Sequence, residues 1–148
     1  MPIVRRQAEV EWEGSLEQGK GSFAVGSWAV GEIPVDWASR TGDSQGNTSP
    51  EELMAAAHAS CYAMALSRVL DSLNAPPEKL YVGAVCALDE VEGAPRITAM
   101  DLEIIGVIPS LDAEGFRDAA EQADQICPVT NALRGNVDIS LSATLEEG

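Results

Sequence analysis

Long hydrophobic runs, aromatic residues and a signal-like start are all missing or scarce in this sequence of 148 residues. No run of 18 apolar residues occurs, so the sequence predicts no membrane-spanning helix. The opening MPIVRRQAEVEWEG has two arginines but no apolar segment after them, so we expect no secretory signal and take a cytoplasmic location as the default. Aromatic residues make up only 5% of the chain, which argues against an aromatic-rich binding face.

Positive charge is also scarce. Nine Lys and Arg residues stand against 24 Asp and Glu residues, giving a formal net charge of −15. Such a field repels phosphate backbones and anionic lipid surfaces. We therefore expect neither nucleic acid nor a membrane as a partner, and a weak preference for neutral over anionic substrates.

The chain has a single histidine and only three cysteines, which are Cys61, Cys86 and Cys127. No CxxC or HxxxH spacing occurs, and one histidine leaves a zinc site short of ligands. The cysteines are too few and too far apart for the disulfide framework of a secreted domain. We expect no metal and no bound cofactor. Any disulfide in a reducing compartment would be transient and would form as part of a reaction of the thiols.

The patterns that are present predict one α+β domain over residues 1–148. Alternating residues 7–14 predict a half-buried strand, and the glycine-broken segment 19–37 predicts short strands in a meander. The polar residues 39–50 predict a loop that carries one cation, Arg40. Further on we expect two strands around a turn at residues 92–95, a helix ending near residue 126, a short helix after Pro128 and a closing strand.

The central helix has the clearest start signal in the chain. Ser49 fits the N-cap, Pro50 the first helical position and Glu52 the third, which together predict a capping box. From Leu53 onward nearly every position is apolar until Asn74 and the following prolines end the helix. A helix that is apolar all round needs burial on most sides, and a chain of this length has difficulty surrounding it. This pattern predicts a dimer.

The three thiols differ in what surrounds them in the sequence. Cys86 lies in an alternating strand among small apolar residues, which favours core packing. Cys127 lies at a helix boundary, where structural and chemical uses are about equally supported. Cys61 lies inside the apolar helix, where burial raises a thiol's pKa, so a thiolate there requires a cation. Arg40 and His58 are candidates, although a lone arginine is more often solvated and a buried histidine more often structural.

Two separated motifs carry a family resemblance. GNTSPEELMAAAHASCYAMALS and CPVTNAL, with EWEG, GKG and SR upstream, closely resemble the OsmC/Ohr family of osmotically inducible and organic hydroperoxide resistance proteins. The resemblance covers nearly the whole chain, and the AAHASC wording and the position of Arg40 are more similar to the OsmC branch. It implies an intertwined homodimer in which antiparallel strands surround two main helices, with the central helices buried and the sites at the subunit interface.

The resemblance also implies a function. It implies a thiol peroxidase that reduces organic hydroperoxides in oxidative stress defence, with Cys61 as the peroxidatic and Cys127 as the resolving cysteine. Arg40 and Glu51 match the family's polar pair at the thiol, where Arg40 would stabilise the thiolate and Glu51 would hold the guanidinium. The reductant would be an external dithiol, and the Ohr branch is associated with lipoylated proteins. Glu52, next to Glu51, is interpreted as the structural capping residue.

One spacing adds a condition to this hypothesis. Glu51 and Cys61 are ten residues apart, which is roughly 15 Å along a continuous helix. If both serve one site, either the helix is broken or Glu51 comes from a partner chain. Two other functions stay open at this point: a non-catalytic small-molecule carrier and a thiol redox sensor. A carrier would need none of Cys61, Cys127, Arg40 and Glu51, so their joint presence favours the enzyme.

Overall fold

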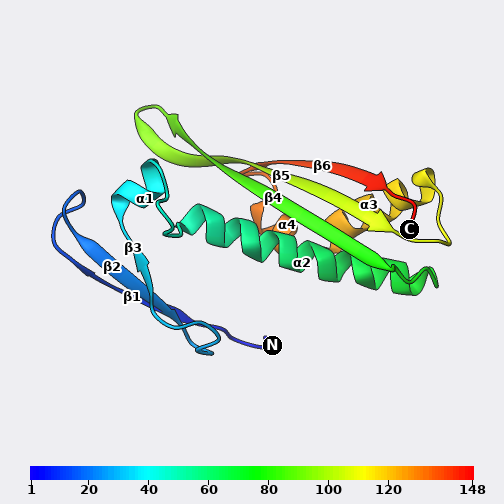
Figure 1. Cartoon of the computed structure of the whole chain (residues 1–148), viewed down its shortest axis with the longest axis horizontal. Coiled ribbons are helices and arrows are strands. Elements are labelled where there is room, and N and C mark those ends of the chain that lie inside the picture. Colours follow the sequence, from blue (N-terminus) through cyan, green and yellow to red (C-terminus); the bar gives the residue numbers. More distant parts are fainter. The chain divides into compact units, whose positions relative to one another are not determined.

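The structure, a computed structural model, describes all residues from Met1 to Gly148. The chain divides into two compact units, Met1–Leu53 and Met54–Gly148. The first unit holds three strands and a short helix, and the second holds three longer strands and two helices (Figure 1). Helix α2 (Pro50–Ser72) begins in the first unit and continues through the second. The expectation of a single domain over 1–148 stays a prediction.

The first unit is built on a small antiparallel sheet in the order β1-β2-β3 (Figure 1). The strands are β1 (Ala8–Glu13), β2 (Lys20–Val25) and β3 (Ile33–Val35), which confirms the predicted meander. The predicted burial of β1 was wrong. All six of its residues are exposed, including Val10 at 60%, because nothing else in this unit covers that side of the strand.

The segment expected to be a loop begins with a short helix, α1 (Trp37–Thr41). Its N-cap is Asp36, whose Oδ1 accepts a hydrogen bond of 2.8 Å from the backbone N–H of Ser39. An aspartate cap of this kind satisfies one of the free N–H groups of the first helical turn. Arg40 therefore stands in the last turn of a helix rather than in a loop.

Helix α2 begins and ends where the sequence predicts. The Oγ of Ser49 accepts a hydrogen bond from the Glu52 N–H at 3.1 Å, as expected of an N-cap. The Glu52 carboxylate instead accepts from the Thr48 hydroxyl at 2.9 Å, so only half of the predicted capping box is seen. At the other end, Asn74 has a φ of 52° and the Ala75 N–H bonds to the Leu70 carbonyl, the arrangement of a Schellman motif.

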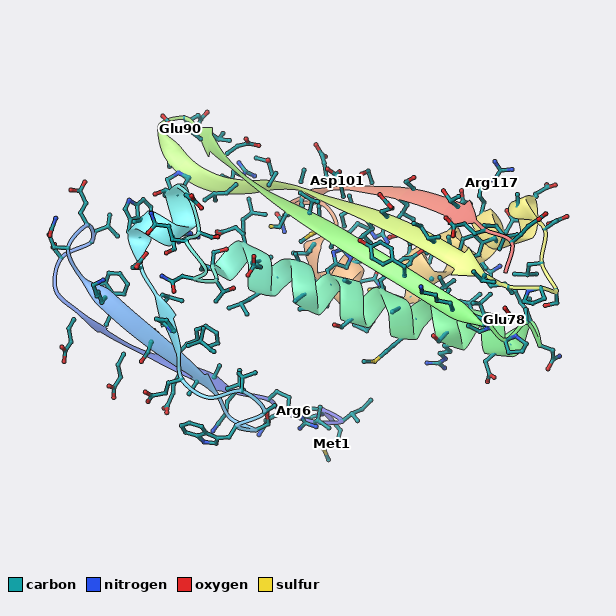
Figure 2. The ribbon with its side chains drawn as sticks, viewed as in Figure 1. Met1, Arg6, Glu78, Glu90, Asp101 and Arg117 are labelled. Atoms are coloured by element: carbon teal, nitrogen blue, oxygen red, sulfur yellow. The ribbon has the colours of Figure 1, made fainter.

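The second unit is a three-stranded sheet in the order β4-β5-β6 (Figure 1). Strands β4 (Lys79–Val91) and β5 (Ala94–Val107) form a long hairpin, and Glu90 lies close to its tip (Figure 2). The two turn residues, Glu92 and Gly93, have φ values of 53° and 81°, as a two-residue turn between twisted strands requires.

The last strand corrects one detail of the predicted architecture. The sequence was expected to give antiparallel strands, and β1 to β5 pair in that way. However, β6 (Asp138–Leu145) runs parallel to β5. Helices α3 (Ala113–Ile126) and α4 (Pro128–Leu133) form the crossover that a parallel connection needs. The class remains α+β, as predicted.

The core of the second unit lies between its helices and one face of this sheet. Helix α2 contributes Tyr62, Leu66 and Leu70, and the inward face of β5 contributes alternate residues, Met100, Leu102 and Ile104. Helix α3 closes the core with Phe116, Ala119 and Ala123. A Cβ at Gly106 would lie 2.8 Å from the Phe116 ring, so this strand position needs a glycine for the ring to pack on it.

Helix α2 is long and apolar enough, by length and composition alone, to cross a membrane. The sequence has no run of 18 apolar residues, so it did not predict a helix of this kind. A single helix of this kind is weak evidence for a membrane span, because the core helix of a globular domain passes the same test. One face of α2 is occupied by the core of the second unit, while Met64 on another face is 72% exposed.

Candidate active site

Cys61 lies in the fourth turn of α2, at the edge of the core of the second unit. It is half-buried, whereas Tyr62 next to it is fully buried. The apolar run that makes α2 pack against the sheet therefore also places this thiol partly out of water.

Cys127 lies at the elbow between α3 and α4. It ends α3, where its N–H donates to the Ala123 carbonyl at 2.9 Å, and it is also the N-cap residue of α4. Pro128 cannot continue α3 and is well suited to the first position of α4, so the sequence itself produces this elbow. The Cys127 side chain is fully buried in the same cluster against which Cys61 packs.

The fold brings these two thiols together although they are 66 positions apart in the chain. Burial raises the pKa of Cys61. The Val129 backbone N–H, at the start of α4, hydrogen bonds to Cys61 and lowers its pKa, while the bonded Cys127 thiol raises it further. Burial is the largest of these effects, so within a single chain the net pKa of Cys61 lies above its ordinary value.

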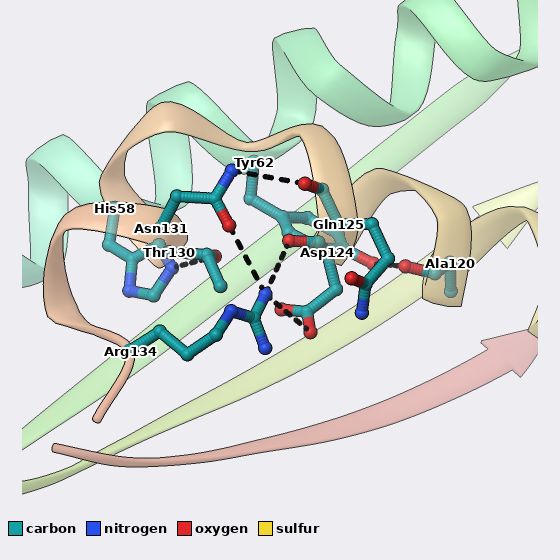
Figure 3. A network of polar contacts seen from close by, with 8 residues as sticks. All are labelled: His58, Tyr62, Ala120, Asp124, Gln125, Thr130, Asn131 and Arg134. Atoms are coloured by element: carbon teal, nitrogen blue, oxygen red, sulfur yellow. Dashed lines mark hydrogen bonds and ion pairs between the residues drawn. The ribbon is translucent and has the colours of Figure 1, made fainter.

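Polar contacts join α2 to α3 and α4, the two helices on either side of Cys127 (Figure 3). The Nε2 of His58 and the Oγ1 of Thr130 are 2.7 Å apart, which joins α2 to α4. The Tyr62 hydroxyl donates to the Ala120 carbonyl at 2.7 Å, which joins α2 to α3. Burial lowers the pKa of His58, against an opposing effect of the Asp124 charge. His58 is therefore a neutral residue of the core and not the cation of a Cys61 thiolate.

In the first unit, the structure brings Arg40 and Glu51 together. The Nη2 and Nε of Arg40 donate to one oxygen of Glu51, Oε1, at 2.8 and 3.0 Å. The Glu51 side chain is 8% exposed and that of Arg40 33%. The Arg40 guanidinium also lies 5.9 Å from the centre of the Trp37 ring, within the range of a cation–π contact. Glu51 thus fixes the orientation of a half-buried cation.

An apolar hollow of about 240 Å³ lies beside Arg40 within the same unit. Its lining residues come from β1, β3, α1, the segments next to them and the first position of α2; they are Trp12, Leu16, Val35, Asp36, Trp37, Arg40 and Pro50. Two tryptophan rings and a guanidinium give the hollow a mainly apolar wall with one cationic group. Such a wall suits a neutral, apolar molecule that carries one polar end.

The remaining sequence predictions for individual residues have simple outcomes. Cys86 lies in β4 opposite Met100, on the inward face of the sheet, and packs against the core as predicted. Glu52 is exposed and acts at the helix start through Thr48. The structure has no group of three or more His, Cys, Asp or Glu side chains that could hold a metal ion.

Sequence reasoning missed the polar partners around the thiols. Thr130 is fully buried against His58, and the Tyr62 hydroxyl reaches a carbonyl of α3. The one usable signal was the pair of large side chains with polar groups, His58 and Tyr62, one helical turn apart in the apolar part of the helix. Their partners are 58 and 72 positions away, so no local pattern could identify them.

Comparison with known proteins gives the family. The model of the family described as OsmC-like protein matches residues 42–142. Peroxiredoxin OsmC of Escherichia coli is 31% identical over 136 residues, which cover 92% of this chain and 94% of that protein. The organic hydroperoxide resistance protein of Xanthomonas axonopodis pv. citri is 28% identical over 127 residues, or 84% and 87% of the two chains.

Solved structures of organic hydroperoxide resistance proteins share the fold of this chain. The crystal structure of the organic hydroperoxide resistance protein OhrB of Bacillus subtilis superposes with a TM-score of 0.74 and 25% identity, covering 93% of this chain and 97% of that one. A structure of an organic hydroperoxide resistance protein from Elizabethkingia anophelis has a TM-score of 0.76 and 24% identity, covering 99% and 100%; this second likeness concerns the fold alone. The chain belongs to the OsmC-like family, as the sequence motifs indicated.

Proposed function

We propose that this protein is a thiol peroxidase that reduces organic hydroperoxides to alcohols, in defence against oxidative stress. The observation that carries the proposal is the meeting of the Cys61 and Cys127 thiols, with the Val129 N–H on the Cys61 sulfur. A half-buried thiol next to a second thiol suits a cycle of oxidation and disulfide closure. The named relatives, a peroxiredoxin and organic hydroperoxide resistance proteins, support the same activity.

In the proposed cycle the Cys61 thiolate attacks the terminal oxygen of the hydroperoxide. The O–O bond breaks, the alkoxide leaves and takes up a proton to become the alcohol, and Cys61 becomes a sulfenic acid. The Cys127 thiolate then attacks the Cys61 sulfur, forming the S–S bond while the S–O bond breaks and hydroxide leaves as water after protonation. An external dithiol, with a lipoylated protein as one candidate, returns both thiols by two exchange steps.

Arg40 and Glu51 are proposed to make the first step possible. Because burial raises the pKa of Cys61, a thiolate there needs a cation. Arg40 is that cation in this proposal, and the two hydrogen bonds that it donates to Glu51 Oε1 hold its guanidinium in place. The apolar hollow beside Arg40 would take the organic part of the substrate. The net charge of −15 favours a neutral hydroperoxide over an anionic one.

We further propose a homodimer in the cytoplasm in which a second copy supplies the Arg40–Glu51 pair to Cys61. Helix α2 is continuous from Pro50 to Ser72, so the alternative of a break between Glu51 and Cys61 finds no support. Ten residues of helix rise roughly 15 Å, more than a glutamate side chain spans. The face of α2 that carries Met64 is also left uncovered in a single chain.

The test of the activity follows peroxide loss when the reduced protein is mixed with cumene hydroperoxide and excess dithiol. Wild type and the control Cys86→Ser are expected to turn over repeatedly, and Cys61→Ser to consume no peroxide above background. Cys127→Ser should react about once per chain and then stall or over-oxidise. Equal rates in wild type and Cys61→Ser would reject the peroxidase, and normal turnover by Cys127→Ser would remove its resolving role.

The shared site has its own test. Neither Glu51→Gln nor Cys61→Ser alone keeps a complete site, but a mixed dimer of the two would contain one site with both native residues if they come from different chains. Mixing the two variants under conditions of subunit exchange should therefore restore activity. No gain over the sum of the separate variants would contradict the shared site without affecting the role of Cys61.

A further inference from the structure

The elbow between α3 and α4, defined here as Ile126–Val129, carries both groups that contact the Cys61 sulfur. They are the Cys127 thiol and the Val129 N–H. The elbow itself is an extended break between two helices, with Cys127 at φ −68° and ψ 116°. The backbone of such a break does not determine how far the elbow lies from α2. Side-chain contacts between the elbow region and α2 must set that distance.

Two buried hydrogen bonds from α2 provide that hold, one on each side of the elbow. Before it, the Tyr62 hydroxyl donates to the Ala120 carbonyl at 2.7 Å. After it, His58 Nε2 meets Thr130 Oγ1 at 2.7 Å. On α2, His58 and Tyr62 are one helical turn apart, and Cys61 lies between them in the sequence. The thiol is thus flanked by the two residues that dock the opposite segment.

The two helices of this segment are also tied to each other without α2 (Figure 3). Asn131 donates to the Gln125 carbonyl at 3.0 Å, and Arg134 donates to the Asp124 carbonyl at 3.1 Å and lies 3.5 Å from its carboxylate. These bonds link α3 to α4 directly. The hydrogen bonds from α2 therefore position two helices that also have contacts of their own.

The protonation of His58 follows from its surroundings. Its Nδ1 is buried without a hydrogen-bond partner, and an unpaired N–H costs more than an unpaired lone pair. The proton therefore belongs on Nε2, which donates to Thr130 Oγ1. Thr130 is the only partner in this arrangement, so its hydroxyl decides whether the imidazole is satisfied.

We propose that His58 and Tyr62 are positioning residues for the thiol pair, docking the elbow so that the Cys127 thiol and the Val129 N–H both face Cys61. In this proposal they act through the elbow, and the Tyr62 hydroxyl lies close enough to Cys127 for the charge of its thiolate to raise the pKa of Tyr62. The use of the pair in peroxide reduction rests on the proposed function, but the docking itself does not. The docking of the elbow gives the Cys127 thiol a high effective concentration at the Cys61 thiol.

The experiment measures that concentration without peroxide. The protein is equilibrated in mixtures of reduced and oxidised glutathione, where Cys61 and Cys127 lose two electrons and two protons to form a disulfide and one glutathione disulfide becomes two thiols. Acid quenching, alkylation and peptide mass spectrometry then give the fraction of Cys61–Cys127 disulfide. The pKa of Cys61 is followed in parallel by the ultraviolet absorbance of the thiolate.

Thr130→Val removes the hydroxyl at nearly constant shape, and Tyr62→Phe does the same on the other side. Each is expected to lower the effective concentration by about fivefold to tenfold, the equivalent of one buried hydrogen bond. Thr130→Val should also raise the pKa of Cys61, because the Val129 N–H is displaced. Thr130→Ser keeps the hydroxyl and should stay close to wild type.

Two controls separate positioning from general loss of stability. Ile104→Val trims a fully buried side chain of β5, which belongs neither to the elbow nor to α2. Thr98→Val removes a side-chain hydrogen bond to Asp89 within the hairpin β4–β5. Both should leave the disulfide equilibrium unchanged. An unchanged equilibrium in Thr130→Val and Tyr62→Phe, an equal fall in Ile104→Val, or no Cys61–Cys127 disulfide in wild type would each overturn the proposal. Lack of peroxide turnover with these dependences intact would overturn only the proposed function.

Discussion

The change Glu51→Gln tests whether the carboxylate next to the start of α2 forms an ion pair that stabilises the fold. Glu51 and Glu52 are adjacent acids in the first turn of one helix, and only Glu51 is buried. Glu51 Oε1 accepts both hydrogen bonds from Arg40, whereas Glu52 accepts one from the exposed Thr48. Glu52→Gln is therefore a matched control for the same chemical change one residue away.

The magnitude follows from the contacts. Hydrogen bonds to a charged group contribute roughly 1.5–3 kcal/mol, and neutral ones about half as much. Glutamine keeps an acceptor oxygen but loses the charge, and it also relieves the burial of Oε2, which has no partner. With Arg40 one-third exposed, solvent screening reduces the loss further. We expect Glu51→Gln to lower the free energy of unfolding by about 1 kcal/mol, or Tm by roughly 2–4 °C.

The assay is urea unfolding of wild type, Glu51→Gln, Arg40→Gln and the double variant, with Glu52→Gln as the control. The cycle should give a coupling between Arg40 and Glu51 of at least about 0.5 kcal/mol, since contacting residues are not additive. Glu52→Gln should change the free energy of unfolding by less than about 0.5 kcal/mol. Additive effects of Arg40→Gln and Glu51→Gln, or a larger loss in Glu52→Gln, would refute the reasoning.

Three further predictions concern pH and packing. Burial lowers the pKa of His58 in the folded protein below its ordinary value of 6.5. Between the lowered pKa and 6.5 the unfolded chain therefore binds more protons than the folded one, so the free energy of unfolding should fall as the pH drops through and below 6.5. The urea midpoint of His58→Gln should depend less on pH over this range, and an equal dependence would contradict the burial of a neutral imidazole. Arg40→Met should move the pH profile of Cys61 alkylation to higher pH, whereas Arg40→Lys should move it less; an unmoved profile in Arg40→Met would exclude Arg40 as the cation. Gly106→Ala should cost about 1–3 kcal/mol in urea unfolding, because the new Cβ lies 2.8 Å from the Phe116 ring, and a neutral change would show that the ring can shift freely.

Much of the secondary structure could be predicted because its signals are local. The cap at Ser49, the apolar run after it and the stop at Asn74 all act within a few residues, and they define α2 correctly. The errors in the predicted secondary structure also concern short segments of the chain. Asp36 caps α1 within a polar stretch that was interpreted only as a loop. Strand β1 has the alternation of a half-buried strand, yet alternation cannot say whether anything covers its apolar side.

For the candidate site, the sequence determined which residue types are available and left their meeting undecided. It placed Cys61 in a capped apolar helix and Cys127 before a helix-breaking proline, and motif resemblance paired them. Only the tertiary structure joins Cys61 to Cys127 across 66 positions and His58 to Thr130 across 72. Contacts of that range depend on how α3 and α4 cross back over the sheet, and no pattern within a few residues encodes that path.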